Sequence, residues 1–189
     1  MNFDELEDTY DLEKFKNKTK RKNGCRKGKR VERDLVKILN EKFDNGFSRS
    51  VGSGNRWSQV ANLPKHAKDT LTGDLCAPEG FRFVCESKGG YGNLDLDSTL
   101  DGGLKGLDDF IEQVEDDSRR CGKLPLLLWK RDRKPWLIFC KSHVLEGNYK
   151  YYLVYRDYTC VPLKEFLKLP KEYFFENYTK SSKSKTLDS

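Results

Sequence analysis

A continuous apolar run that directly follows the pattern of an amphipathic helix is the feature that most limits the fold of this chain. The run extends from Leu124 to Trp129, is interrupted only by Pro125, and is typical of a buried strand. In the preceding residues, apolar side chains recur at three- and four-residue steps, which predicts an amphipathic helix over residues 107–121. Another strand is predicted over residues 81–88, so this helix is a crossover between two strands. Such a crossover implies an α/β fold with a central mixed β-sheet flanked by helices.

The other periodic segments complete the predicted order of elements. An amphipathic helix is predicted over residues 28–43, because apolar side chains from Val31 to Phe43 cover one arc of it. The remaining predictions are a hairpin of residues 74–77 and 81–88 around Pro78–Gly80, strands at 136–140 and 149–155, and short helices at 163–169 and 171–178. The length of 189 residues fits one domain, which we expect at residues 26–178. A charged arm at residues 1–25 and a disordered tail at 179–189 are expected to flank it.

The charges are arranged in blocks, which the modest net charge of +6 conceals. Residues 1–13 contain six acids and no Lys or Arg, whereas residues 14–30 contain ten Lys and Arg and no acid. Residues 92–117 are acidic, and residues 119–134 are basic. Basic blocks of this kind are either solvated arms or phosphate-binding surfaces.

Several functional classes are disfavoured by the sequence. No stretch approaches the roughly 18–20 apolar residues of a membrane span, and the N-terminus lacks the pattern of a signal peptide. We therefore expect a cytoplasmic protein without membrane association. The six cysteines lack zinc-ligand spacing, so reduced and mostly buried thiols are expected. His66 and His143 have no evident partner, and structural roles are the simpler interpretation.

One acidic residue falls on the apolar side of the first predicted helix. Glu32 lies between Leu39 and Phe43 around the helix axis. A carboxylate on such a stripe is costly unless it is paired or bound to a cation. Both interpretations are open: a buried ion pair with a nearby arginine, or a contribution to a metal site.

A short loop after this helix combines glycines and arginines. Gly52 and Gly54 permit close approach of the backbone to a ligand, and Arg49 and Arg56 are placed to bind phosphates. A plain flexible loop is the alternative interpretation of this pattern.

Asp74, Glu86 and Lys88 form the strongest candidate site. Glu86 and Lys88 share one face of a predicted strand, and Asp74 joins them if the hairpin turn comprises three residues. Two ionised carboxylates on one face repel each other, and a hard cation such as Mg²⁺ removes that repulsion. An ammonium beside them suits metal-assisted hydrolysis of a phosphodiester. Taken alone, Glu86 and Lys88 also fit a surface ion pair.

The ordered set resembles the PD-(D/E)xK nuclease superfamily, and in particular the archaeal- and phage-type Holliday junction resolvases. The resemblance rests on residues 29–33 (KRVER), residues 49–54 (RSVGSG), Asp74 and residues 86–88 (ESK), within a core of about residues 26–140. The resemblance implies a restriction-endonuclease-like core of α-β-β-β-α-β type. Gly73 precedes the first acid where the family pattern has proline, and residues 141–189 extend beyond the core.

The resemblance also implies a role for each matching residue. Asp74 and Glu86 would be metal ligands with the Ser87 carbonyl, Glu32 would complete or support the metal site, and Lys88 would be the catalytic lysine. Mg²⁺ is the implied metal, with Mn²⁺ as a substitute. Gln113, on the rim of the crossover helix, resembles a glutamine found there in some related nucleases, although an exposed polar residue is the plainer interpretation.

These observations lead to three functional hypotheses. The first is a Mg²⁺-dependent, structure-specific DNA endonuclease that resolves four-way junctions as a homodimer in the cytoplasm. One version of this hypothesis is that a phage encodes the protein, which then acts in the cytoplasm of the host. The second is a nuclease of the same fold that cuts flap, nicked or duplex DNA, and the third is a non-catalytic DNA-binding protein. The expected DNA contacts are Lys29, Arg30, Arg33, Arg49, Ser53 and Arg56.

Overall fold

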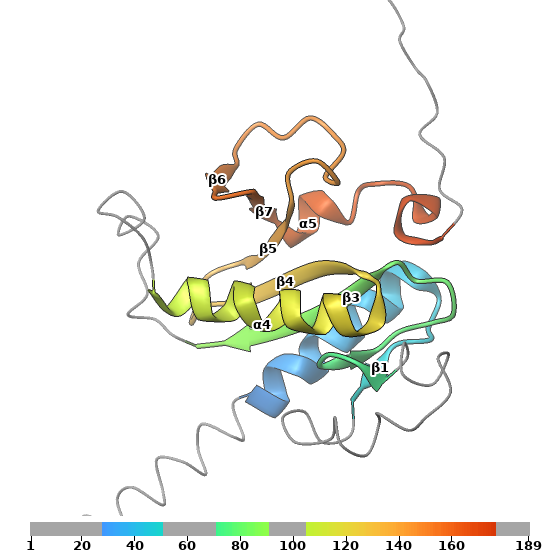
Figure 1. Cartoon of the computed structure of the whole chain (residues 1–189). Coiled ribbons are helices and arrows are strands. Elements are labelled where there is room, and N and C mark those ends of the chain that lie inside the picture. The colour runs from blue at the N-terminus through green and yellow to red at the C-terminus, as the bar shows by residue number, and fades with distance from the viewer. Residues whose placement is uncertain (1–27, 51–70, 91–104, 177–189) are drawn as a thin grey trace, which may run out of the picture.

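The computed structural model describes residues 28–50, 71–90 and 105–176 (Figure 1). The charged arm, Ser53, Arg56, His66 and the tail at 179–189 lie outside the described residues.

A five-stranded mixed sheet forms the centre of the molecule (Figure 1). Its strands lie in the order β3 (Phe83–Gly89), β4 (Leu124–Lys130), β5 (Trp136–Lys141), β7 (Tyr158–Pro162) and β6 (Leu153–Tyr155). β3 and β4 are parallel and are joined through α4 (Lys105–Cys121), whereas the other pairs are antiparallel. The predicted α/β fold with a mixed sheet and a helical crossover is confirmed.

Helices cover both faces of the sheet, and the alternation of side chains along β3 explains why. Phe83 and Cys85 pack with the helix at residues 28–43, with α5 (Leu163–Phe166) and with the 3-10 helix η2 (Lys171–Phe174). Val84 points to the opposite face and packs with α4. The continuous apolar run in β4 is needed because Leu126 and Leu128 serve one face while Leu127 and Trp129 serve the other.

The predicted hairpin of residues 74–77 and 81–88 is wrong in its pairing. β2 (Leu75–Cys76) pairs with β1 (Ser48–Arg49) in a separate two-stranded sheet, not with β3. The chain does reverse at Pro78–Gly80, where the Phe81 N–H donates to the Pro78 carbonyl at 3.1 Å. The two short strands β1 and β2, followed by β3, nevertheless give the expected α-β-β-β-α-β order.

The C-terminal extension differs from prediction in detail. Only Leu153–Tyr155 of the strand expected at 149–155 is formed, and β7 was not predicted. The two C-terminal helices are shorter than expected, with four residues each. Pro170 separates them, since it has no N–H to continue a helix.

The extension belongs to the core and does not merely cover it. Tyr173 and Phe174 of η2 are buried, and the ring of Phe174 lies 5.0 Å from that of Phe43 in the first helix. The Arg82 N–H donates to the Phe174 carbonyl at 3.0 Å, and Phe81 forms a bridge with Phe175. The last described residues therefore complete the sheet face that carries the first helix.

Candidate active site

Asp74 is fixed against the outer edge of β3, the edge strand of the large sheet. The Asp74 N–H donates to the Cys85 carbonyl at 3.0 Å, and the Ser87 N–H donates to Asp74 Oδ2 at 2.9 Å. These two bonds mimic the pairing of a neighbouring strand. The approach requires the glycine before Asp74: Gly73 has φ +83°, and a Cβ there would lie 2.8 Å from the Cys85 carbonyl oxygen.

Glu86 and Lys88 lie on the face of β3 that α4 covers. Lys88 Nζ donates to Glu86 Oε1 at 2.5 Å and to Gln113 Oε1 at 2.6 Å. Gln113 projects from α4, so the crossover helix holds the lysine from above the sheet. Glu86 is 2% exposed and Asp74 is 8% exposed, which makes both carboxylates unusual for acidic side chains.

The electrostatics of this pair favour binding of a cation. Burial raises the pKa of Glu86 to about 8, and the charge of Asp74 acts in the same direction while Lys88 opposes it. Burial also raises the pKa of Asp74, although the hydrogen bond from the Ser87 N–H and the charge of Lys88 lower it. Two buried carboxylates with raised pKa values are stabilised in their ionised form by a nearby cation.

The atoms at this edge that could bind a metal ion are all oxygens. The Ser87 N–H points outward to Asp74, so the Ser87 carbonyl faces the same edge, because both groups of one strand residue point the same way. Two carboxylates and a backbone carbonyl are ligands that suit Mg²⁺. Among the described residues, no group of three His, Cys, Asp or Glu side chains is close enough to form a metal site by itself.

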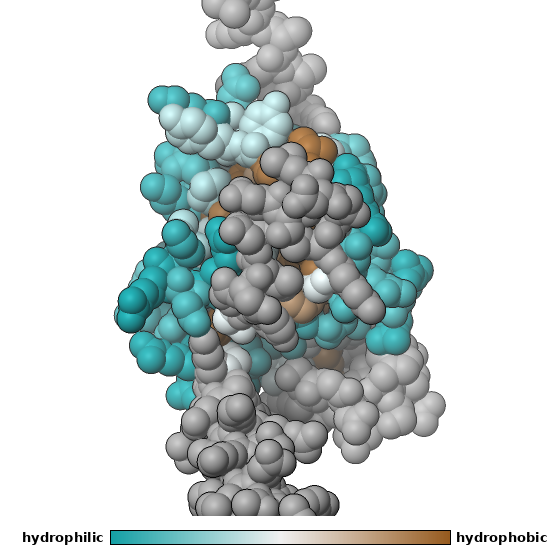
Figure 2. Space-filling view, turned by 90° about the vertical axis from the view of Figure 1, so that its left-hand side faces the viewer, coloured by the Kyte–Doolittle hydropathy of each residue, from teal (hydrophilic) through white to brown (hydrophobic). Residues whose placement is uncertain are grey.

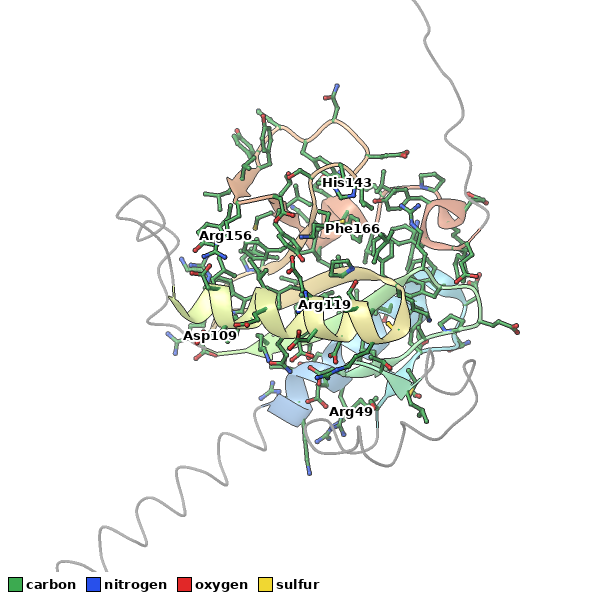
Figure 3. The ribbon with its side chains drawn as sticks, in the orientation of Figure 1. Arg49, Asp109, Arg119, His143, Arg156 and Phe166 are labelled. Carbon is green, nitrogen blue, oxygen red and sulfur yellow. The ribbon has the colours of Figure 1, made fainter. Side chains whose placement is uncertain are left out.

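Glu32 is brought near the site and is paired with an arginine. Arg49 Nε donates to Glu32 Oε2 at 2.6 Å, which is the ion pair that one interpretation of the sequence proposed. Arg49 lies beneath α4 in the view of Figure 3. The charge of Glu32 nevertheless raises the pKa of Asp74, after the larger effect of burial, so the two carboxylates interact.

Asp117 is a fourth acid near the site, and sequence reasoning missed it. Its charge adds to the factors that raise the pKa of Glu86, and its own carboxylate lies 3.3 Å from Arg120. Asp117 follows Gln113 by four residues and therefore lies one helical turn along the same side of α4. This four-residue spacing from Gln113 was the feature of the sequence that could have identified Asp117 as a site residue.

The predicted DNA-contact residues are only partly within the described chain. Lys29, Arg30 and Arg33 are exposed on the first turns of the helix at residues 28–43. Arg49 forms an ion pair with Glu32, and Ser53 and Arg56 lie outside the described residues. In the described part of the chain, no helix is long and apolar enough to cross a membrane.

Comparison with known proteins identifies the family. A search of curated proteins gives no match. The structure of Hjc, a Holliday junction resolvase from Archaeoglobus fulgidus, is similar over 74% of this chain and 91% of the resolvase, with 20% identity and a TM-score of 0.34. The model of the family "Phage putative PDDEXK endonuclease" matches residues 23–180, which confirms the resemblance to PD-(D/E)xK nucleases. The chain therefore belongs to this family of phage endonucleases.

Proposed function

We propose that this endonuclease is a metal-dependent, structure-specific DNase that hydrolyses phosphodiester bonds in four-way junctions. The observation that carries the proposal is the convergence of Asp74, Glu86 and Lys88 at β3, the edge strand of the large sheet. Membership of an endonuclease family argues against a non-catalytic DNA-binding protein.

We assign Asp74, Glu86 and the Ser87 carbonyl as the ligands of Mg²⁺, with Glu32 as a supporting residue. The raised pKa values of both carboxylates support this assignment, because bound Mg²⁺ would stabilise their charged forms. The metal would supply polarisation of the scissile phosphate and activation of water. Mn²⁺, which accepts the same oxygen ligands, would substitute for it.

Lys88 is the proposed catalytic lysine. Its ammonium is held by Glu86 and Gln113, so it has a fixed position beside the carboxylates. From there it would neutralise charge that develops on the phosphate during attack by water. Gln113 keeps the ammonium at this position by accepting one of its hydrogen bonds.

The choice of four-way junctions rests on the sequence resemblance to resolvases. Paired cuts across a junction need two active sites, which is why we propose a symmetric homodimer. The exposed cations Lys29, Arg30 and Arg33 would contact DNA phosphates, together with Arg49, Ser53 and Arg56. The host cytoplasm is the proposed place of action.

A panel of DNA substrates tests the proposal. Purified protein would be incubated with a four-way junction, a flap, a nicked duplex and a linear duplex, each with Mg²⁺ and with EDTA. We expect paired, Mg²⁺-dependent cuts in the junction at rates well above those on the other substrates. Preferential cutting of a flap or duplex would replace the junction assignment, and equal cleavage in EDTA would refute metal dependence.

A further inference from the structure

Two adjacent tyrosines on the C-terminal extension are exposed to an unusual degree. Tyr151 is 73% exposed and Tyr152 is 64% exposed, and Val154 in β6 is also exposed. Single exposed apolar residues need no explanation, but a contiguous group of large ones indicates contact with a partner. The side of the molecule that Figure 2 faces carries pale and brown atoms in its upper part, among hydrophilic teal ones.

A lysine lies beside this tyrosine pair (Tyr151 and Tyr152). Lys150 Nζ lies 5.3 Å from the centre of the Tyr151 ring, a cation–π distance. A cation beside an exposed aromatic ring is a combination that suits nucleic acid, since the ring stacks on a base and the cation binds a phosphate.

The register of the sheet places a second basic feature between the active site and the tyrosine pair. This is the basic turn (residues 130–134, KRDRK), which joins β4 to β5 and contains four cations and one acid. Along this end of the sheet, Lys88 of β3 pairs with Trp129, just before the turn, and Leu137 pairs with Pro162. Tyr152 immediately precedes Leu153, which pairs with Cys160 of β7.

Arg131 of the basic turn packs against the face of the sheet that α4 covers. Its guanidinium lies 5.3 Å from the centre of the Trp129 ring, and Trp129 belongs to the same core cluster as Cys160 of β7. At about 4.8 Å per strand, the four spacings from β3 to β6 amount to about 19 Å, or about six base steps of DNA.

Arg133 has an unusual backbone conformation in the basic turn. Its φ is +57°, in the left-handed region where glycine has no steric penalty and a long side chain does. Strain of this kind is concentrated at functional sites. Glycine would relieve the strain at this exposed position, yet the chain has an arginine there.

We propose that the tyrosine pair and the basic turn form a second DNA-contact surface outside the active site, which stacks on unpaired bases next to a branch point. The inference rests on the proposed function in that it names branched DNA as the substrate. The basic turn would bind phosphates between the cleavage site and the unpaired bases, and Tyr151 and Tyr152 would stack on those bases.

A second copy of the chain fits this surface less well. A tyrosine contributes at most about 150–250 Å² of buried area. The tyrosine pair and Val154 therefore fall well short of the roughly 800 Å² that each partner buries in a stable interface. Lys150, beside the Tyr151 ring, is also unfavourable for a symmetric contact, because the two copies would bring equal charges together.

The test compares the binding of three DNAs by variants that do not cut. Tyr151→Ala/Tyr152→Ala, Tyr151→Phe/Tyr152→Phe and Arg133→Gly would each be made in the full chain with Lys88→Ala. Fluorescence anisotropy in EDTA would give Kd for oligothymidylate, a four-way junction and a matched duplex. Melting temperatures would show that each variant is folded.

The alanine pair is expected to weaken binding of oligothymidylate and of the junction by about 10-fold or more, and binding of the duplex by less than about 2-fold. The phenylalanine pair retains the rings and is expected to bind like its parent. Arg133→Gly is expected to weaken binding of all three DNAs and to make the salt dependence shallower, with an equal or higher melting temperature.

Equal Kd values for oligothymidylate in the alanine pair and its parent would overturn the inference. A change from dimer to monomer in the alanine pair, measured by sedimentation, would also overturn it, since the surface would then be a subunit interface. Failure of the wild-type protein to cut junctions would refute the proposed function only, because oligothymidylate binding still reports on the tyrosine pair.

Discussion

At the scale of single residues, the main feature is one ammonium held between a strand and a helix. Lys88 donates to Glu86 on its own strand and to Gln113 on α4, so its position depends on both elements. Asp74 is fixed just as firmly, through its backbone and its carboxylate. A site built this way is preorganised before DNA arrives.

Removal of any of the three charged groups is expected to abolish cleavage but not binding. Lys88→Ala, Glu86→Gln and Asp74→Asn should each lower the rate of DNA cleavage by about 10²–10³-fold or more, because each removes stabilisation of the reacting phosphate or its metal. Junction binding should change by less than about 2-fold. Lys168→Ala is a matched control, since Lys168 pairs only with Glu165 among the contacts described for it and is exposed. Wild-type cleavage by Lys88→Ala or Glu86→Gln would exclude this site.

Glu86→Gln is also expected to stabilise the metal-free protein at high pH. Burial holds the pKa of Glu86 at about 8, above its ordinary value of 4.5. The stability associated with the neutral carboxyl is therefore complete below about pH 4.5 and is lost as the pH rises through 8. Glutamine does not ionise, so the difference in melting temperature in EDTA should increase between pH 5 and pH 9. Parallel melting curves for the two proteins across this range would contradict the expectation.

Much of the candidate site follows from the sequence because strand alternation is a strict rule. Glu86 and Lys88 had to share a face, and Gln113 had to lie on the rim of its helix. The sequence did not decide the partner of Glu32, because only packing determines whether a core-facing carboxylate contacts a metal ion or an arginine. Asp117 was missed because its relevance depends on how α4 is rotated over the sheet.

At the scale of secondary-structure elements, a close approach between the first helix and β3 positions Glu32. A Cβ on Gly89 would lie 2.6 Å from a methyl group of Val31. Only a residue without a side chain allows the helix to lie this near to the end of β3 that carries Lys88.

Gly89→Ala is therefore expected to displace the helix and to weaken both stability and cleavage. Overpacking of this kind costs about 1–3 kcal/mol, and each kcal/mol lowers the melting temperature by about 2–4 °C in a chain of this size. Gly28→Ala is the control, since a Cβ there meets nothing within 4 Å. Adding Val31→Ala to Gly89→Ala should recover activity relative to Gly89→Ala alone, and failure to do so would mean that the clash is not the cause.

Long elements were predictable and short ones were not, for a physical reason. The helices at residues 28–43 and 105–121 and the strands β3 to β5 repeat their pattern often enough to define a face. β2 has two residues, so its pattern cannot specify a partner. β7 was missed because its turn lacks a glycine: Arg156 adopts φ +54° there, and its guanidinium lies 2.9 Å from a carboxylate oxygen of Asp108.

At the scale of the whole molecule, the extension and the family core form one folded unit, which we propose spans residues 26–178. Phe174 contacts Phe43, Phe83 and Phe166, so helix, sheet and extension share a single aromatic cluster. Two-state unfolding is expected of such a unit.

Phe174→Ala is expected to lower the free energy of unfolding by about 3–5 kcal/mol, as for other large truncations of buried aromatic side chains. Urea unfolding followed by circular dichroism would measure the loss. Tyr152→Ala is the matched control, because it truncates an exposed aromatic residue of the same extension. A chain ending at residue 162 that melts like the full protein would show that residues 163–176, with α5 and η2, are a separate unit.

The contact between Phe43 and Phe174 also sets the order of events during synthesis. Phe43 of the first helix meets Phe47 and Phe81 early, but its last aromatic partners, Phe174 and Phe175, come about 130 residues later in the chain. At translation rates of about 5–20 residues per second, roughly 7–26 s separate Phe43 from Phe174. Glu32 is carried by that helix, so the nascent nuclease lacks a settled active site during this interval. We therefore expect the ability to cut DNA to appear only after Phe174 has left the ribosome and packed against the first helix.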